Sequence, residues 1–471
     1  MELCPYASHN AELSKSLIKV VENCLLANSE VFQLPAPITN LIFTERAEFA
    51  FIILRKLSLQ PARAGIGPLY EGVLKYVWKA ILNQKPEFRR ALSTGEDIGY
   101  YRSLLRTLYM ALLAQQARTD VLPVQICYMI LDMLNLVVAQ GFMDLAQAAQ
   151  ARPDTTNPED IALITGILQA SLRLNGIEVI HGGVGMHVSD QGTIRAATTL
   201  YSWAEQIGAS TNGNNDPVYG ELAVLFLLEL SYVPLLAEQL AVEPLLELLL
   251  TSNLSHTIRN TMTAGLNNPL QYHRLHNIWS RGLLPILVNL LAAIGPRIGP
   301  DVVRFLSFFG RQMEALVDSW GQRGNAITLA AIRETEALVG LIEILRAWGI
   351  ETPSQRKGQR KLNLNANTNG ADIDMTNSIT SSDEIAWGQL NTEGADRIRF
   401  DKGTILEGVE YLLNHRNYLA SLVVPTTLEE EEENSGVDKA GMSKLVENVI
   451  KEMDTLRRLL TVVIGDEVEK V

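Results

Sequence analysis

Two histidines three residues apart are the first candidates for chemistry. His273 and His276 lie on one face of a predicted helix. A metal site needs further Cys, His, Asp or Glu ligands that converge on the same point, and the other residues between positions 272 and 277 supply none. We therefore expect a packed or hydrogen-bonded pair of histidines, with no metal ion and no cofactor.

A glycine-rich segment that runs from His181 to His187 is the second candidate. Gly183 and Gly185 resemble part of a phosphate-binding GxGxxG loop, but Val188 stands where the third glycine belongs. No predicted strand precedes the segment, and no acidic residue is placed to hold a ribose. We predict that residues 177–188 form a loop or a short irregular segment that joins helices.

Paired acids occur at Glu45 and Glu48 and again at Glu159 and Asp160. Acidic residues are common on solvated helix faces and in the first turn of a helix, so neither pair indicates a catalytic dyad. The GxxxxGK[ST], GxSxG and HExxH patterns are absent from the sequence. The sequence thus predicts no catalytic, cofactor-binding or metal-binding residue, and a protein that is not an enzyme.

The three cysteines, Cys4, Cys24 and Cys127, are widely spaced. An odd number without a CxxC pair predicts neither a disulfide framework nor a zinc site. Each is expected to pack as a small apolar side chain in a reducing compartment.

The chain has 471 residues, 47% of them hydrophobic, and a formal net charge of -13. That charge repels phosphate backbones and anionic lipid headgroups, which argues against nucleic acid or a membrane surface as the main ligand. Residues 1–10 have no signal-peptide pattern. The most apolar stretch, residues 222–250, is interrupted by glutamates and by Pro234 and Pro244, and we expect buried helices there without a membrane span.

Helical periodicity dominates the chain. Residues 13–25 carry an apolar stripe, formed by Leu13, Leu17, Val20, Val21, Cys24 and Leu25. Further helices are expected over residues 38–57, 67–83, 98–117 and 121–149. A stripe of Val302, Leu306, Phe309, Met313, Leu316 and Trp320 predicts one helix that opens at Gly299-Pro300. Asn157-Pro158 and Asp216-Pro217 offer N-caps followed by a proline in the first turn.

These helices, joined by short Pro/Gly/Asn turns, predict an all-α fold. The favoured architecture is an irregular α-solenoid, a superhelical stack of the HEAT or armadillo kind, over residues 1–350. A compact helical bundle is the alternative, because no fixed-period repeat signature is visible.

The composition changes at about residue 351. Residues 351–400 are rich in Asn, Thr, Ser, Asp and Gly and predict a disordered polar linker or long loop. Its basic cluster, which begins at Arg356, is either a solvated group of charges or a nuclear-localisation patch.

Residues 401–471 predict C-terminal helices that cap the solenoid. The acidic run Glu429–Glu433 is expected to lie in a flexible segment. The last helix, residues 439–464, has a seam with the spacing of a coiled coil, made of Val446, Val449, Met453, Leu456, Leu460 and Val463. The seam packs either on the solenoid or on a helix of a partner.

Residues 268–287, NPLQYHRLHNIWSRGLLPIL, resemble the C-terminal region of the large inner-ring scaffold nucleoporins, most of all the nucleoporin 188 class of fungi. The segment ERAEFA at 45–50 resembles the same region. The resemblance implies a superhelical stack in the nuclear pore complex at the nuclear envelope, as the end of a much longer protein. It also implies binding of short helical linker segments of other nucleoporins, and of Phe-Gly repeats, in grooves between helices.

The favoured function is a structural scaffold that binds other nucleoporins and supports nucleocytoplasmic transport, including transport of mRNA. The alternative is a soluble karyopherin-like transport receptor or another helical-repeat adaptor. No partner-binding residue is assigned by the sequence.

Overall fold

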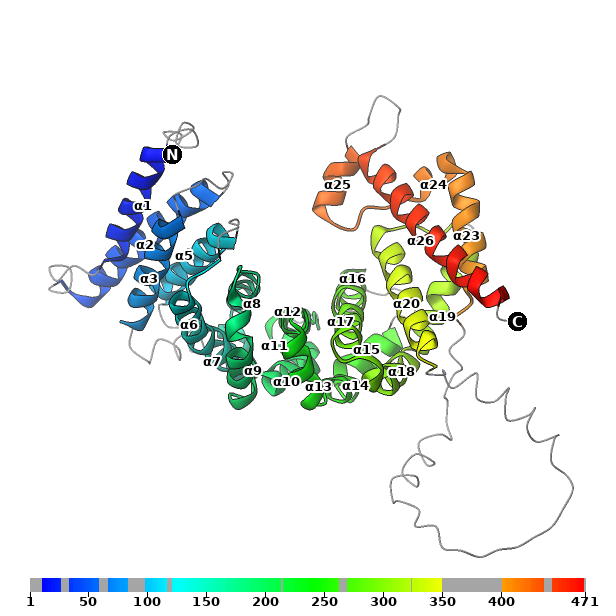
Figure 1. Ribbon diagram of the computed structural model, residues 1–471, viewed down its shortest axis with the longest axis horizontal. Helices are drawn as coiled ribbons and strands as arrows, with labels where there is room; N and C mark the ends of the chain where they lie inside the picture. Colours follow the sequence, from blue (N-terminus) through cyan, green and yellow to red (C-terminus); the bar gives the residue numbers. More distant parts are fainter. Residues whose placement is uncertain are drawn as a thin grey trace, which may run out of the picture. The chain divides into compact units, whose positions relative to one another are not determined.

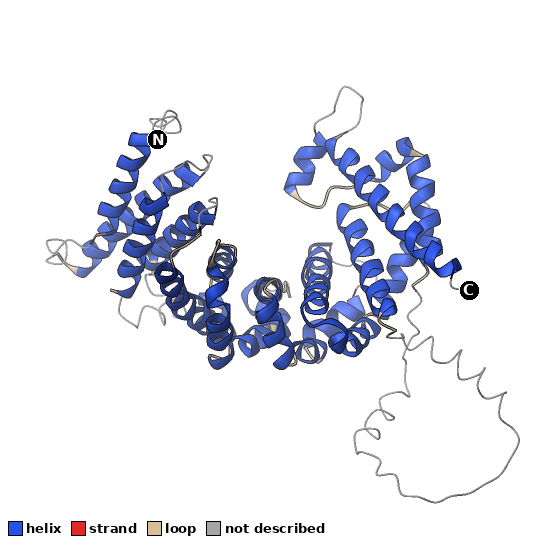
Figure 2. Ribbon diagram, viewed as in Figure 1, coloured by secondary structure: helices blue, strands red, loops and turns tan. Residues whose placement is uncertain are grey.

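The computed structural model describes residues 11–26, 34–58, 67–83, 98–116, 121–212, 215–261, 269–322, 324–349, 400–435 and 443–469. These residues are helical almost throughout, as predicted (Figure 2). The extended pairing among them is a single parallel bridge between Ile327 and Val423. They form two compact units, Met1–Leu254 and Ser255–Val471. The predicted linker at 351–400 lies outside the described residues except for its last position.

The helices of the first unit follow in chain order (Figure 1). They are α1 (Ala11–Leu25), α2 (Ala36–Ser58), α3 (Gly67–Leu82), α5 (Gly99–Gln116), α6 (Val124–Met133), η3 (Leu134–Ala139), α7 (Gln140–Ala151), η4 (Pro153–Thr155), α8 (Pro158–Leu172), η5 (Ile177–Ile180), α9 (His181–Asp190), α10 (Thr193–Ser202), α11 (Ala204–Asn212), α12 (Val218–Ser231), α13 (Pro234–Val242) and α14 (Leu245–Leu250). Helix α15 (Asn253–Thr261) spans the boundary between the two units.

The second unit continues with α16 (Pro269–Asn277), η6 (Ile278–Leu283), α17 (Leu284–Ile294), η7 (Gly295–Ile298), α18 (Gly299–Phe308), α19 (Gly310–Gly321), α20 (Leu329–Ala347), α23 (Lys402–Asn414), α24 (Arg416–Leu422), α25 (Leu428–Ser435) and α26 (Lys444–Glu469). Segments η3 and η6 are π-helical turns that join α6 to α7 and α16 to α17 without interrupting the helix.

Helices of the first unit pack in two rows. Helix α5 lies between α2 and α8, and α8 in turn packs on α12. In the other row, α10 contacts α7 and α14, while α9 contacts α13. Each helix therefore buries its apolar face against elements close to it in the chain, which is the arrangement of an irregular α-solenoid.

Hydrogen bonds between helices recur at a nearly constant sequence separation. Arg102 pairs with Asp160 across 58 residues, Gln169 bonds Glu229 across 60, and His276 bonds Glu334 across 58. Lys402 and Glu343 form an ion pair across 59 residues. Each pair thus joins a side chain to a carboxylate that lies 58 to 60 residues away in the sequence, although the sequence shows no repeated motif at this period.

Within the described residues, two helical stretches, Val124–Ala151 and His273–Phe308, are long and apolar enough to cross a membrane by length and composition alone, and the bent pair Pro158–Leu172 and Ile177–Asp190 passes the same test together. The shares of their apolar windows buried inside the fold are 56% and 50%. The apolar side chains of α6, α7 and α17 form much of this buried part, because residues such as Phe142 and Leu287 are fully buried.

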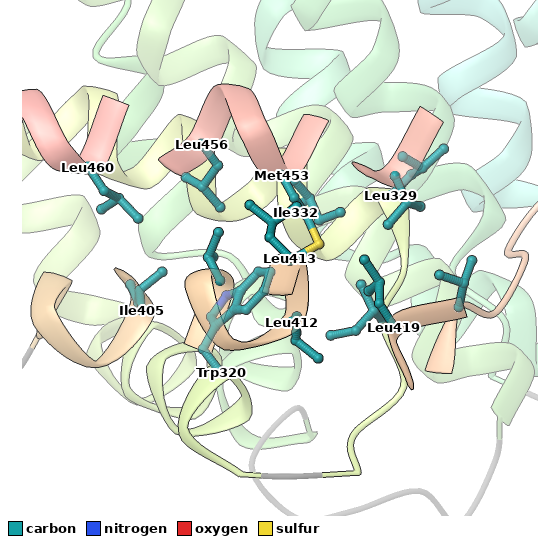
Figure 3. Close-up of a cluster of buried hydrophobic side chains, with 14 of the residues drawn as sticks. Trp320, Leu329, Ile332, Ile405, Leu412, Leu413, Leu419, Met453, Leu456 and Leu460 are labelled. Carbon is teal, nitrogen blue, oxygen red and sulfur yellow. The ribbon is translucent and has the colours of Figure 1, made fainter. Parts of the chain in front are cut away.

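One hydrophobic cluster of the second unit gathers around the last helix (Figure 3). All six residues of the predicted seam of α26 are buried, and α26 packs on α20 and α23. Trp320 of α19 and Ile332 of α20 belong to the same cluster. The seam is therefore occupied by helices of this chain.

Several sequence predictions were wrong at element boundaries. Phe309 has a non-helical backbone, so the stripe from Val302 to Trp320 belongs to two helices, α18 and α19. Asn157 caps α8 as predicted, with its side chain accepting from the Glu159 amide. Asp216 does not cap α12, which begins at Val218. In α1 the buried stripe is Ser14, Ile18, Val21 and Leu25, whereas Leu13 and Val20 are exposed.

The acidic run at 429–433, predicted to lie in a flexible segment, forms part of helix α25. Thr427 Oγ1 accepts a hydrogen bond from the Glu430 amide at 3.2 Å, and the Glu430 carboxylate accepts from the Thr426 amide at 2.7 Å. This reciprocal bonding is a variant of the capping box, which stabilises the first turn of a helix. Glu433 also pairs with Lys444 of α26.

Glu229 is a buried carboxylate between α8 and α12, where the sequence indicated only an interruption of an apolar run. It is 8% exposed. Its carboxylate accepts from Gln169 at 2.6 Å and from Arg173 at 3.3 Å. Desolvation raises the pKa of Glu229, although the hydrogen bond from Gln169 and the charge of Arg173 oppose that shift.

We predict that Glu229→Gln stabilises the protein at pH 7–8. Because the folded-state pKa of Glu229 lies above its usual value of 4.5, the folded state binds the proton more tightly than the unfolded state. The ionised carboxylate therefore lowers the free energy of unfolding as the pH rises and Glu229 loses its proton. This destabilisation is absent below about pH 4, where the carboxyl is protonated. Thermal unfolding measured from pH 4 to pH 8 should show a Tm gain only at the upper end.

The matched control is Glu247→Gln, since Glu247 is exposed on α14. Its Tm should follow that of the unmodified protein at every pH. A Glu229→Gln protein that melts lower than the unmodified chain at pH 8 would contradict the prediction.

Gly408 of α23 lies close to the backbone of α19. A Cβ built there would lie 2.5 Å from the Trp320 carbonyl oxygen, whereas a Cβ at Gly340 in α20 would meet nothing within 4 Å. We predict that Gly408→Ala costs about 1–3 kcal/mol because the two backbones must separate. Gly340→Ala should gain up to about 1 kcal/mol. Urea unfolding of both variants checks this, and equal effects would exclude the close packing as the cause.

Candidate functional site

The two histidines at 273 and 276 have different surroundings in the structure. The His276 ring nitrogen Nε2 lies 2.7 Å from a carboxylate oxygen of Glu334, and the other oxygen accepts from Trp279 Nε1 at 2.7 Å. Glu334 is 4% exposed, whereas His273 is exposed. Sequence analysis found no acidic partner near the pair because Glu334 arrives from α20, 58 residues away. Within the described ranges, no three His, Cys, Asp or Glu residues are grouped to hold a metal ion.

The glycine-rich segment was wrongly predicted as a loop. Residues 177–180 form a helical turn, and His181–Asp190 form α9. A Cβ at Gly183 would lie 2.7 Å from Leu131 Cδ2, and one at Gly185 would lie 3.3 Å from Leu236 Cδ2. These two glycines therefore allow α9 to approach its neighbours closely, and packing overrides their weak helix propensity. Burial lowers the pKa of His181, with Glu178 opposing the shift.

One acid of each pair is less solvated than the sequence indicates, whereas Glu45 and Glu159 are exposed as predicted. Asp160 is 3% exposed, and both its oxygens accept from Arg102, at 2.8 and 2.7 Å. Glu48 accepts from Ser103 Oγ at 2.8 Å. These carboxylates connect α8 to α5 and α2 to α5, so their role is to fix neighbouring helices relative to one another. The sequence could not predict this role of Asp160 and Glu48, because it does not show that Arg102 and Ser103 lie beside them in the fold.

The cysteines carry no activated thiol in the described part of the chain. Burial raises the pKa of Cys24 and of Cys127 above the usual thiol value, which keeps both protonated at neutral pH. The Cys127 thiol donates to the Gly176 carbonyl at 3.5 Å. Cys4 lies outside the described residues.

One pocket of about 390 Å³ opens in the second unit between the end of α19, α23 and α24. Its polar lining includes Asn325, Thr404, Glu407, Tyr411 and Tyr418. Asn325 Nδ2 donates to the Ser319 carbonyl at 3.1 Å, which closes the turn after α19. A single carboxylate and two phenols give hydrogen-bonding capacity but no nucleophile paired with a base.

The surface offers large apolar side chains that this fold leaves exposed. Val121, Met186, Val242 and Leu428 are each at least 66% exposed. Binding of apolar side chains from another protein is the chemistry that such a helical surface supports.

Comparison with known proteins identifies the family. Residues 73–460 match the family model described as the nuclear pore protein NUP188 C-terminal domain. Nucleoporin NUP188 of Chaetomium thermophilum is 31% identical over 445 residues, covering 88% of this chain and 22% of that protein. Nucleoporin NUP188 of Saccharomyces cerevisiae is 25% identical over 465 residues, covering 94% of this chain and 26% of that protein.

A solved fragment of Nup188 from Myceliophthora thermophila has the same fold. It superposes with a TM-score of 0.62 at 29% identity, over 83% of this chain and 98% of that fragment. This confirms the predicted helical solenoid.

The chain spans about a quarter of the length of these two curated relatives. The predicted location, the nuclear pore complex, agrees with the family. The nucleoporin 188 class, proposed from residues 268–287, is confirmed over most of the chain: this protein belongs to the NUP188 family of nuclear pore proteins and corresponds to its C-terminal domain.

Proposed function

We propose that this chain is a structural scaffold of the inner ring of the nuclear pore complex, which binds other nucleoporins and catalyses no reaction. The match of residues 73–460 to the NUP188 C-terminal domain carries the proposal. The fold supports it, because its buried polar groups connect helix to helix. Asp160, Glu229 and Glu334 each accept hydrogen bonds from side chains of a neighbouring helical segment.

Recognition in such a scaffold depends on exposed helical surface. Short helical segments of other nucleoporins, and Phe-Gly repeats, insert apolar side chains between the helices of a stack. The affinity then comes from buried apolar area at about 25 cal/mol per Å², reduced by the cost of ordering the segment. The C-terminal helices contribute by covering the end of the stack, since α26 buries its seam on α20 and α23.

We predict that the intact protein captures nucleoporins through this region. Tagged full-length protein, and the same protein without this chain, would be purified from cells and their bound proteins compared by mass spectrometry. Nucleoporins with helical linker segments should be recovered by the first and depleted at least tenfold with the second. Absence of any nucleoporin partner for the full-length protein would contradict the scaffold function.

A transport receptor would behave differently in the same assay. Addition of a GTP-loaded transport GTPase should leave the captured nucleoporins bound to a scaffold. Release of bound protein by the GTP form, and not by the GDP form, would establish the karyopherin-like alternative.

A further inference from the structure

Six exposed apolar residues gather on adjacent elements of the first unit. They form what we call the apolar face, made of Val121, Val124, Tyr128, Val179, Met186 and Leu235. Their exposed fractions range from 48% for Leu235 to 73% for Val121. A soluble fold gains nothing by exposing a contiguous group of large apolar side chains, so such a face indicates an interaction surface.

The contacts beneath these residues show that the face is continuous. The segment η5–α9 lies between α6 and α13. On one side, Val121 lies against Gly176, and Leu131 lies against Gly183, each less than 3 Å from the position of a Cβ. On the other side, Leu235 Cδ2 is 3.8 Å from the Cβ position of Gly182, and Gln239 donates to Ser189 Oγ at 3.1 Å.

The centre of the apolar face contains two glycines, which have no side chain. Val179, Gly182, Gly183 and Met186 follow one another at steps of three, one and three residues, which places them on one side of the helix. Close packing on Leu131 explains Gly183, but a Cβ at Gly182 would make only an ordinary contact. Because a helical glycine costs about 1 kcal/mol relative to alanine, an exposed glycine without an internal need is consistent with close approach by another backbone.

The charged residues on the elements that form the face are all acidic. Asp132 on α6, Glu178 on η5, Asp190 on α9 and Glu238 on α13 are exposed. None of the four makes an ion pair with another residue in the described part of the chain. These elements contain no Lys or Arg, and residues 121–254 hold 14 acidic residues against three arginines. The potential here therefore attracts cations.

We propose that the apolar face binds an amphipathic helix whose apolar stripe is flanked by Lys and Arg. This deepens the proposed function, on which it rests, by naming the surface and the chemistry of the segment bound there. The apolar stripe covers Tyr128, Met186 and Leu235 and runs over the glycines, while its basic flanks lie near Glu178 and Glu238. Apolar burial gives the affinity, and the opposite charges give orientation and a fast association rate.

The test uses a fluorescent 14-residue peptide of Leu and Lys in amphipathic order, titrated with the 471-residue chain by anisotropy. Tyr128→Ser/Met186→Ser should weaken binding at least tenfold. Glu178→Gln/Glu238→Gln should weaken it several-fold and flatten its salt dependence. The matched control, Leu428→Ser/Val462→Ser, removes two exposed apolar residues of the second unit and should bind as the unmodified chain does. Circular dichroism confirms that each variant is folded.

Several results would overturn the proposal. The first is that a peptide with Glu in place of every Lys binds as tightly as the Leu/Lys peptide. The second is that the control variant loses as much affinity as Tyr128→Ser/Met186→Ser. The third is that the Leu/Lys peptide shows no saturable binding. Two further arms test other occupants. Sedimentation with phosphatidylcholine vesicles that depends on Met186 would assign the face to lipid, and self-association that depends on Met186 would assign it to a second copy.

The scaffold function and this inference fail in distinguishable ways. If the full-length protein captures no nucleoporin at all, the scaffold function fails. If the full-length protein carrying Tyr128→Ser/Met186→Ser retains every nucleoporin partner, the scaffold function stands and the apolar face is not its binding surface.

Discussion

Burial of apolar side chains between helices that are neighbours in the stack is the interaction on which the remaining structure depends. In α5, which packs on α2, α3 and α8, Leu104, Leu105 and Leu108 are buried. No single helix of this chain could bury such a surface alone, because an isolated helix of this length is marginal in water. Stability is then roughly a sum of neighbouring interfaces, and the stack grows by addition.

Buried polar groups determine how neighbouring helices of the stack are positioned relative to one another. A buried carboxylate without partners costs several kcal/mol, so each must meet a donor in a defined position. Arg102 contacts Asp160 with two parallel hydrogen bonds, a geometry that fixes both distance and angle. Glu334, held by Trp279 and His276, does the same between η6 and α20. These contacts define which turns of adjacent helices face each other, while the apolar side chains supply most of the stabilisation.

Close packing of the helices leaves some apolar side chains exposed on the surface. Glycines allow α9 to lie close to Leu131 and Leu236. Met186 of α9 and Val179 of the preceding turn remain exposed. Exposed apolar area beside acidic residues is the kind of surface that the proposed scaffold function requires.

The sequence by itself determined the helical class, most helix positions and the family, because the 3.6-residue apolar period and the residues near 268–287 are local properties of the chain. It also indicated the seam of α26 from the spacing of Val446 to Val463. Only the tertiary structure decided which polar residues meet, since Glu334 and His276 are 58 residues apart. It also decided that residues 177–190 are helical. Local propensity disfavours a helix with three glycines, and contacts with α6 and α13 supply the stabilisation that propensity lacks.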